Sequence, residues 1–184
     1  HTMTVAISDQ PRWTIEDSEE LYRINEWGGP YFSINTPGHV IVSPQGDRGG
    51  SLDLHQLVEA LQKRNLDLPI IIRFSDILED RLDRLNSAFA KAVSRYQYTG
   101  SYQGVFPVKC NQQRHLVESM VAFGERHGFG LEAGSKPELM IALALLSPNS
   151  APLICNGYKD REYIEKALLS QKLGHKTVIV LEQA

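Results

Sequence analysis

The chain has 184 residues, of which 42% are hydrophobic, so it can fill one ordinary domain or part of a larger one. Lys and Arg number 19 against 22 Asp and Glu, and the net charge of -3 is spread without a basic block, which argues against nucleic acid or an anionic membrane as a partner. No apolar run approaches the roughly 20 residues that cross a bilayer, and two separated cysteines, Cys110 and Cys155, suggest buried thiols in a reducing cytoplasm.

The first part of the chain predicts a small segment with one helix and a β-hairpin. Thr14 is a possible helix cap, a Pro-Gly turn separates two short alternating runs, and a glycine-rich loop at residues 44–50 ends the segment. His1 and Thr2 precede the first Met and resemble the remnant of a cleaved tag, so we leave them out of the fold. We therefore assign residues 3–50 to this segment, with its helix over residues 13–27 and its strands over residues 31–35 and 39–43.

From residue 51 onward, short apolar strands alternate with amphipathic helices, the longest of which has Ser75 as its expected cap. Each strand is a short buried-type run, which predicts an α/β fold with parallel strands and helical crossovers. The five expected strands occupy residues 69–74, 104–110, 130–133, 153–155 and 177–182. The four helices between them occupy residues 75–96, 112–127, 135–146 and 161–173.

A doubly wound sheet and a (β/α)8 barrel both begin with this alternation, so periodicity leaves both architectures open. The barrel needs about three more strands than the sequence supplies. Neither a dinucleotide-binding glycine motif nor a P-loop occurs, which weakens the doubly wound alternative without excluding a flavodoxin-like sheet. Six histidines are too scattered for a metal cluster.

Reactive residues gather at the carboxyl ends of the strands in either architecture. Lys109 ends an apolar run, where desolvation would lower its pKa and let the neutral amine attack an aldehyde; a lysine that reaches into solvent is the alternative, and position alone favours it. Glu132, one strand along, is a natural countercharge or proton partner, although a plain salt bridge explains it equally well. Glu138 follows Ser135 at the spacing of a capping box, so its first expected role is in helix capping.

Three motifs resemble the fold-type III pyridoxal-phosphate decarboxylases. Gly104-Val-Phe-Pro-Val-Lys-Cys-Asn111 resembles the lysine-bearing strand of this group, which includes ornithine, diaminopimelate and biosynthetic arginine decarboxylases. Leu131-Glu-Ala-Gly-Ser-Lys-Pro-Glu138 and Cys155-Asn-Gly-Tyr-Lys-Asp-Arg-Glu-Tyr163 resemble the biosynthetic arginine decarboxylase branch in particular. The resemblance runs from about Trp13 to the end of the chain, and the motifs occur in the same order.

The resemblance implies a fold and a set of site residues. Residues 51–184 would be the first part of a TIM-like barrel of the alanine-racemase type, with the rest of the barrel and a carboxyl-terminal β-domain lying outside this chain. Lys109 would carry pyridoxal 5'-phosphate as a Schiff base, and Glu132 would be the second catalytic residue. The residues that would contact the cofactor are Lys109, Glu132, Ser135, Glu138 and Asn156.

The implied reaction is the decarboxylation of L-arginine to agmatine, which feeds polyamine synthesis in the cytoplasm. The resemblance also implies a homo-oligomer, a dimer or tetramer, and Mg2+ beside the pyridoxal phosphate. We expect this chain alone to be an inactive amino-terminal fragment. Three alternatives remain: a decarboxylase of another basic or diamino acid such as ornithine, lysine or diaminopimelate, a non-catalytic binding protein like the antizyme inhibitors, and a flavodoxin-like domain with a structural Lys109.

Overall fold

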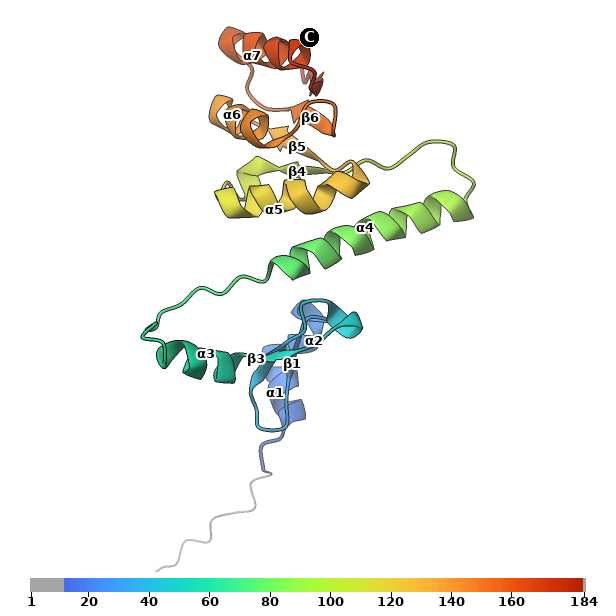
Figure 1. Cartoon of the computed structure of the whole chain (residues 1–184). Coiled ribbons are helices and arrows are strands. Elements are labelled where there is room, and N and C mark those ends of the chain that lie inside the picture. The colour runs from blue at the N-terminus through green and yellow to red at the C-terminus, as the bar shows by residue number, and fades with distance from the viewer. Residues whose placement is uncertain (1–11, 184) are drawn as a thin grey trace, which may run out of the picture. The chain divides into compact units, whose positions relative to one another are not determined.

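The structure is a computed structural model that describes residues 12–183, and the chain divides into two compact units, His1–Arg73 and Phe74–Ala184 (Figure 1). The division falls later than the loop at residues 44–50, where glycine content suggested a boundary. The separate assignment of residues 3–50 and 51–184 stays a prediction. The tag remnant expected at residues 1 and 2 lies outside the described residues.

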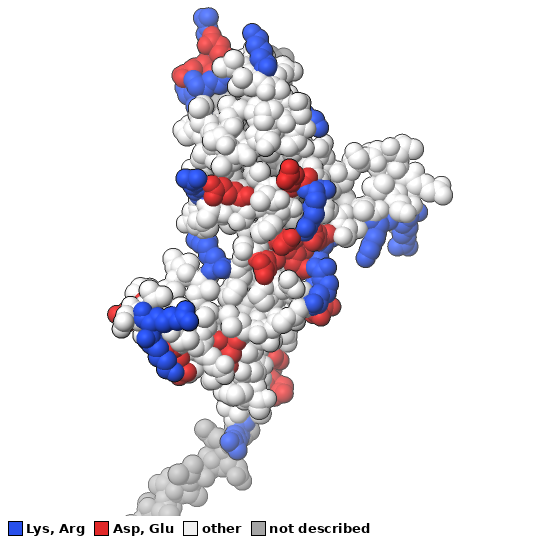
Figure 2. Space-filling model, viewed as in Figure 1, with Lys and Arg blue, Asp and Glu red and all other residues white. Residues whose placement is uncertain are grey.

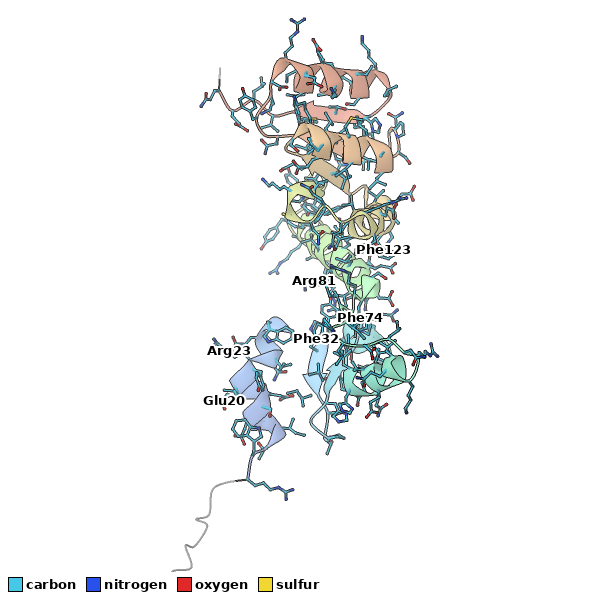
Figure 3. All side chains as sticks on the ribbon, turned by 90° about the vertical axis from the view of Figure 1, so that its left-hand side faces the viewer. Glu20, Arg23, Phe32, Phe74, Arg81 and Phe123 are labelled. Atoms are coloured by element: carbon cyan, nitrogen blue, oxygen red, sulfur yellow. The ribbon has the colours of Figure 1, made fainter. Side chains whose placement is uncertain are left out.

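The first unit begins with two short helices in place of the single helix that the sequence predicted. Arg23, labelled in Figure 3, adopts φ 53° and ψ 37° between them, and this left-handed conformation interrupts the helix. Thr14 is the cap, as expected: its side chain accepts a hydrogen bond from the Asp17 N–H, and the Asp17 carboxylate accepts one from the Thr14 N–H. The two helices are α1 (Ile15–Tyr22) and α2 (Ile24–Trp27).

A three-stranded antiparallel sheet completes the first unit together with one helix. The predicted hairpin is confirmed, with Phe32 opposite Val42. A third strand, which the sequence did not predict, pairs with the other side of the second strand and ends at Asp53, whose carboxylate accepts from the Gln56 N–H and caps the helix that follows. These elements are β1 (Phe32–Ile34), β2 (Val40–Val42), β3 (Leu52–Asp53) and α3 (Leu54–Gln62).

The second unit is a parallel sheet with helical crossovers, which confirms the α/β fold. Its strands lie in the order β4-β5-β6-β7, so neighbours in the sheet are also neighbours in the chain. The strands are β4 (Val105–Pro107), β5 (Gly130–Ala133), β6 (Pro152–Cys155) and β7 (Lys176–Ile179). The helices are α4 (Ser75–Arg95), α5 (Arg114–Gly124), α6 (Lys136–Leu145) and α7 (Arg161–Lys172).

Apolar side chains from the sheet and from three of its helices form the core of the second unit. Leu131 and Leu153 on the sheet and Val117, Leu139 and Ala167 on the helices are fully buried. Full burial of one leucine contributes about 1.5–3 kcal/mol. Because this core fixes the strands, their carboxyl ends are rigid supports for the turns that follow them.

Two predicted features near the boundary between the two units are wrong. Residues 69–74 do not form a strand, and Ile71 within them is 83% exposed. An apolar run becomes a strand when a neighbouring strand completes its hydrogen bonds, and no described strand pairs with this run. Ser75 is not the helix cap but the first residue of α4, whose cap position is Phe74 without a side-chain hydrogen bond.

Acidic and basic side chains are interspersed on the face drawn in Figure 2. Arg126, in the turn after α5, pairs with Glu79 at 3.0 Å and with Asp83 at 2.6 Å, both on α4. This arginine therefore links the long helix to the helix that covers the sheet. None of the helices in the described part of the chain is long and apolar enough to cross a membrane.

Candidate functional site

The parallel register brings several of the predicted site residues to one end of the sheet. Pro107 is opposite Glu132, and Ala133 is opposite Cys155. β4 ends earlier than expected, and a 3-10 turn over Val108–Cys110 replaces the last part of the predicted strand. Lys109 therefore lies in the turn directly after β4, next to the carboxyl end of β5.

Lys109 and Glu132 face each other across this end of the sheet. The Lys109 Nζ atom is 3.6 Å from the Glu132 Oε1 atom, as expected for residues at the carboxyl ends of adjacent parallel strands. The Lys109 side chain is 65% exposed and that of Glu132 is 18% exposed. In this chain the lysine therefore reaches into solvent, as the alternative interpretation of the sequence had it, and its amine is accessible to a reactant.

Two other lysines near this end of the sheet are held by closer polar contacts. Lys136 Nζ donates to Asp160 at 2.8 Å and to Glu162 at 3.0 Å, and these bonds raise the pKa of its ammonium above the usual value. Lys159 is 12% exposed, and its ammonium donates to the Gly157 carbonyl. Of these three lysines, Lys109 has the most exposed amine.

Ser135 and Glu138 lie at the start of α6, directly after β5. The Ser135 hydroxyl caps the helix by accepting from the Glu138 N–H at 3.4 Å, so the expected cap is present on the serine side. The Glu138 side chain is 5% exposed, and within residues 12–183 its buried Oε1 atom has no hydrogen-bond partner. A buried carboxylate oxygen is costly without a partner, which makes this atom a candidate to bind a group from outside the described chain.

The turns after β5 and β6 approach each other closely through their backbones. Gly157 has φ +151°, and a Cβ atom there would lie 2.3 Å from the Gly134 carbonyl oxygen. A Cβ atom on Gly134 would lie 3.1 Å from the Asn156 carbonyl oxygen and 3.5 Å from Glu138 Oε2. The backbone N–H of Asn156 donates to the Ala133 carbonyl at 3.1 Å. Asn156 is thus joined to the strand that carries Glu132.

Tyr163 is a polar contact at this end of the sheet that the sequence analysis missed. Its side chain is 1% exposed and its hydroxyl donates to the Ala133 carbonyl at 2.7 Å. Burial raises the pKa of this hydroxyl, and the Cys155 thiol and the carboxylates of Glu138 and Glu132 raise it further. The spacing of apolar residues on α7 gives no signal for such a role, because a buried tyrosine on a helix is ordinarily a core residue.

The two cysteines differ in exposure. Cys155 is buried, as predicted, and burial raises the pKa of its thiol. Cys110 is exposed, so the prediction of a second buried thiol is wrong, because the residue lies in the turn after β4 and not in the sheet.

Comparison with known proteins adds a family to this geometry. Residues 81–181 match the family model described as pyridoxal-dependent decarboxylase, pyridoxal binding domain. The chain is 65% identical to a biosynthetic arginine decarboxylase of Thermosynechococcus vestitus over 98% of its own length and 28% of the relative. It is 71% identical to one of Nostoc sp. over 93% of its length and 25% of the relative.

A solved structure of the same kind of enzyme is also similar to this chain. The crystal structure of a biosynthetic arginine decarboxylase from Campylobacter jejuni matches with a TM-score of 0.79 and 30% identity, over 88% of this chain and 26% of that protein. The chain spans about a quarter of the length of the relatives it matches. Four of the five predicted site residues lie in or close after β5 and β6, and Lys109 lies just after β4. All five fall within the matched residues 81–181.

Proposed function

The chain belongs to the pyridoxal-dependent decarboxylase family, and from this premise we propose that it is the amino-terminal part of an enzyme that decarboxylates L-arginine to agmatine. The observation that carries the proposal is the accessible Lys109 amine beside the Glu132 carboxylate, at the carboxyl ends of adjacent strands within the residues that match the family's pyridoxal-binding domain. The names of relatives that are 60–71% identical favour arginine over ornithine, lysine or diaminopimelate as the substrate. Family membership also argues against the alternative of a flavodoxin-like domain in which Lys109 is only structural.

The chemistry of the side chains fits pyridoxal 5'-phosphate. When bound, this cofactor supplies an aldehyde that joins an amine and a ring that accepts the electrons released as carbon dioxide leaves. Lys109 offers an exposed amine, and Glu138 offers a buried carboxylate oxygen that has no partner among the described residues. Lys109, Glu132, Ser135, Glu138 and Asn156 are the residues that we propose to hold the cofactor.

The roles of the chain's own residues follow from their positions. Lys109 would hold the cofactor covalently through Nζ. Glu132 can hold a positive charge on that nitrogen or accept a proton from it, because its carboxylate lies 3.6 Å away. The Ser135 hydroxyl and the Asn156 side-chain amide are further hydrogen-bonding groups on the turns after β5 and β6, which are held by close backbone contacts. The strand ends that carry these turns are packed in the core, which holds the turns in place.

The larger architecture belongs to the same proposal. We propose that the parallel sheet is the first part of a TIM-like barrel, completed by strands and a β-domain outside this chain. The pairing Glu132–Ile154–Val178 supports this, because these register partners lie on one face of the sheet and Val178 is 50% exposed, as expected for a face that further strands would cover. An oligomer, a cytoplasmic location and a contribution to polyamine synthesis follow from the family resemblance.

Magnesium is a different case. Among the residues that the structure describes, no group of three or more His, Cys, Asp or Glu side chains is arranged to hold a metal ion. The described residues therefore supply no such group for Mg2+.

Reduction with borohydride tests the assignment of Lys109. In the full-length protein loaded with pyridoxal phosphate, peptide mass mapping should place the reduced adduct on Lys109. Lys109→Ala should remove the visible absorbance of the bound cofactor and agmatine formation, whereas Lys91→Ala, at an exposed position on α4, should retain both. An adduct on Lys136 or Lys159 would contradict the assignment, and a loaded but inactive wild-type protein would favour a non-catalytic relative.

A further inference from the structure

The carbonyl of Ala133, at the carboxyl end of β5, accepts two hydrogen bonds from separate parts of the chain. The Tyr163 hydroxyl on α7 donates at 2.7 Å, and the backbone N–H of Asn156 donates at 3.1 Å. Both donors come from the segment that follows β6. This one carbonyl therefore connects the end of β5, the turn after β6 and the start of α7.

Ala133 lies between Glu132 of the proposed site and the start of α6. It directly follows Glu132, and two residues later Ser135 caps α6. Any rotation of the peptide after Ala133 would move the carboxylate before it and the helix start after it together. The close approach of Gly157 to the Gly134 carbonyl leaves the same turn little room to relax in other ways.

The surroundings of Tyr163 favour a hydroxyl that stays protonated and donates its hydrogen bond to the Ala133 carbonyl. The side chain is 1% exposed, and α7 begins at a cap where the Asp160 carboxylate accepts from the Tyr163 N–H at 2.9 Å. Burial raises the pKa of the hydroxyl, so it is protonated at neutral pH and can donate. A buried tyrosine needs a partner for its hydroxyl, and here the partner is a backbone atom beside the proposed site.

We propose that Tyr163 is a positioning residue, whose hydroxyl fixes the Ala133 carbonyl and thereby keeps Glu132 beside Lys109. The inference rests on the proposed function, since it assigns to Tyr163 an effect on the pair that would carry the cofactor. Tyr163 acts through the backbone of β5 and needs no contact with cofactor or substrate.

Tyr163→Phe tests this in the full-length enzyme, because it removes the hydroxyl and keeps the ring that fills the core. Ser170→Ala is the matched control: Ser170 is also fully buried on α7, and its hydroxyl contacts the Ala167 carbonyl at 2.6 Å and Thr177 Oγ1 at 2.7 Å, far along the helix from Ala133. Both variants lose a buried hydroxyl, so both should lower the melting temperature to a similar extent.

The two variants should differ in catalysis. We expect Tyr163→Phe to lower kcat for arginine about tenfold, which corresponds to about 1.4 kcal/mol in the activation barrier, with little change in KM. The pH dependence of the bound cofactor's visible absorbance should also shift in this variant. Ser170→Ala should keep the wild-type kcat and the wild-type absorbance profile.

Hydrogen exchange supplies a readout that is independent of activity. The amides of Glu138, Leu139 and Asn156, each hydrogen-bonded in the structure, should exchange faster in Tyr163→Phe than in the wild type and should be unaffected by Ser170→Ala. Equal effects of the two variants on kcat and exchange, or no effect of Tyr163→Phe on either, would overturn the inference. A wild-type protein that neither binds pyridoxal phosphate nor forms agmatine would instead overturn the proposed function, and the exchange comparison would still decide whether Tyr163 holds the turn.

Discussion

His175 lies buried between α7 and β7, and its environment disfavours a charge. The residue is 7% exposed, and within the described chain its Nδ1 atom has no hydrogen-bond partner. Burial lowers the pKa of the ring below its ordinary value of 6.5, because protonation would place an unpaired charge in the interior. In the unfolded chain the same ring takes up its proton at higher pH. The stability that depends on a neutral His175 is therefore complete above pH 6.5 and is lost as the pH falls toward the lowered pKa.

We predict that His175→Gln weakens the pH dependence of stability in this window. Thermal unfolding of the full-length enzyme between about pH 7 and pH 5 should show a steeper loss of melting temperature for the wild type than for the variant. His115→Gln, which changes an exposed histidine on α5, should leave the wild-type slope intact. Parallel curves for wild type and His175→Gln would show that this ring is not the group that titrates.

At the residue scale, Lys109 and Glu132 could be predicted from sequence while Tyr163 could not. The first two are charged residues at the ends of apolar runs, a pattern that the parallel register turns directly into proximity. Tyr163 meets its partner 30 residues away in the chain, and its hydroxyl leaves the apolar pattern of α7 unchanged. A hydrogen bond to a distant backbone carbonyl leaves no local signal.

The turns that follow β5 and β6 are in close backbone contact. Gly157 has φ +151°, which side chains rarely adopt, and an added Cβ would lie 2.3 Å from the Gly134 carbonyl oxygen. The strand ends on both sides are packed in the core, so neither backbone can move away without cost.

Gly157→Ala should therefore destabilise the protein by about 2 kcal/mol or more, from backbone strain and the clash together. Gly50→Ala is the control, since no atom lies within 4 Å of its added Cβ and its φ is not in the left-handed range; it should change stability by less than about 0.5 kcal/mol. Denaturant unfolding of both variants measures the difference. A Gly157→Ala protein as stable as the control would mean that the two turns separate easily.

The order and type of the elements could largely be predicted, and the exceptions have physical causes. The alternation of strand and helix from residue 104 onward is local, because each strand pairs with the next one in the chain. The break at Arg23 depends on a single left-handed residue, and β3 is too short to show an alternating pattern. Residues 69–74 have the composition of a strand, but pairing requires a neighbour that composition cannot supply.

At the scale of the whole molecule, the parallel sheet has two open edges in the described chain. β4 pairs with β5 alone, and β7 pairs with β6 alone. Val178 on β7 is 50% exposed and Leu181 beyond it is 81% exposed. An apolar strand with unpaired backbone groups is prone to pair with another chain.

We predict that the 184-residue chain by itself associates in solution and forms no agmatine. Light scattering should give a mass above that of the monomer, and Val178→Lys should reduce association, because a charge on an edge strand opposes pairing. Lys172→Gln, at an exposed position on α7, should leave association unchanged. A stable, active monomer would contradict both the proposal that this chain is an inactive fragment and the proposal that its sheet is part of a barrel.

The sequential strand order has a further consequence, which concerns spacing along the chain. Lys109, Glu132 and Asn156 lie in or just after three consecutive strands, and the intervals between them are 23 and 24 residues. The site thus takes one residue from each repeat near the carboxyl end of its strand, and a length change within any one helix would alter that interval without displacing the residues at the strand ends. One more interval of 24 residues reaches Val180, just past β7, whose N–H donates to the Cys155 carbonyl at 2.9 Å. The period of the fold therefore marks Val180 as the fourth position in this series.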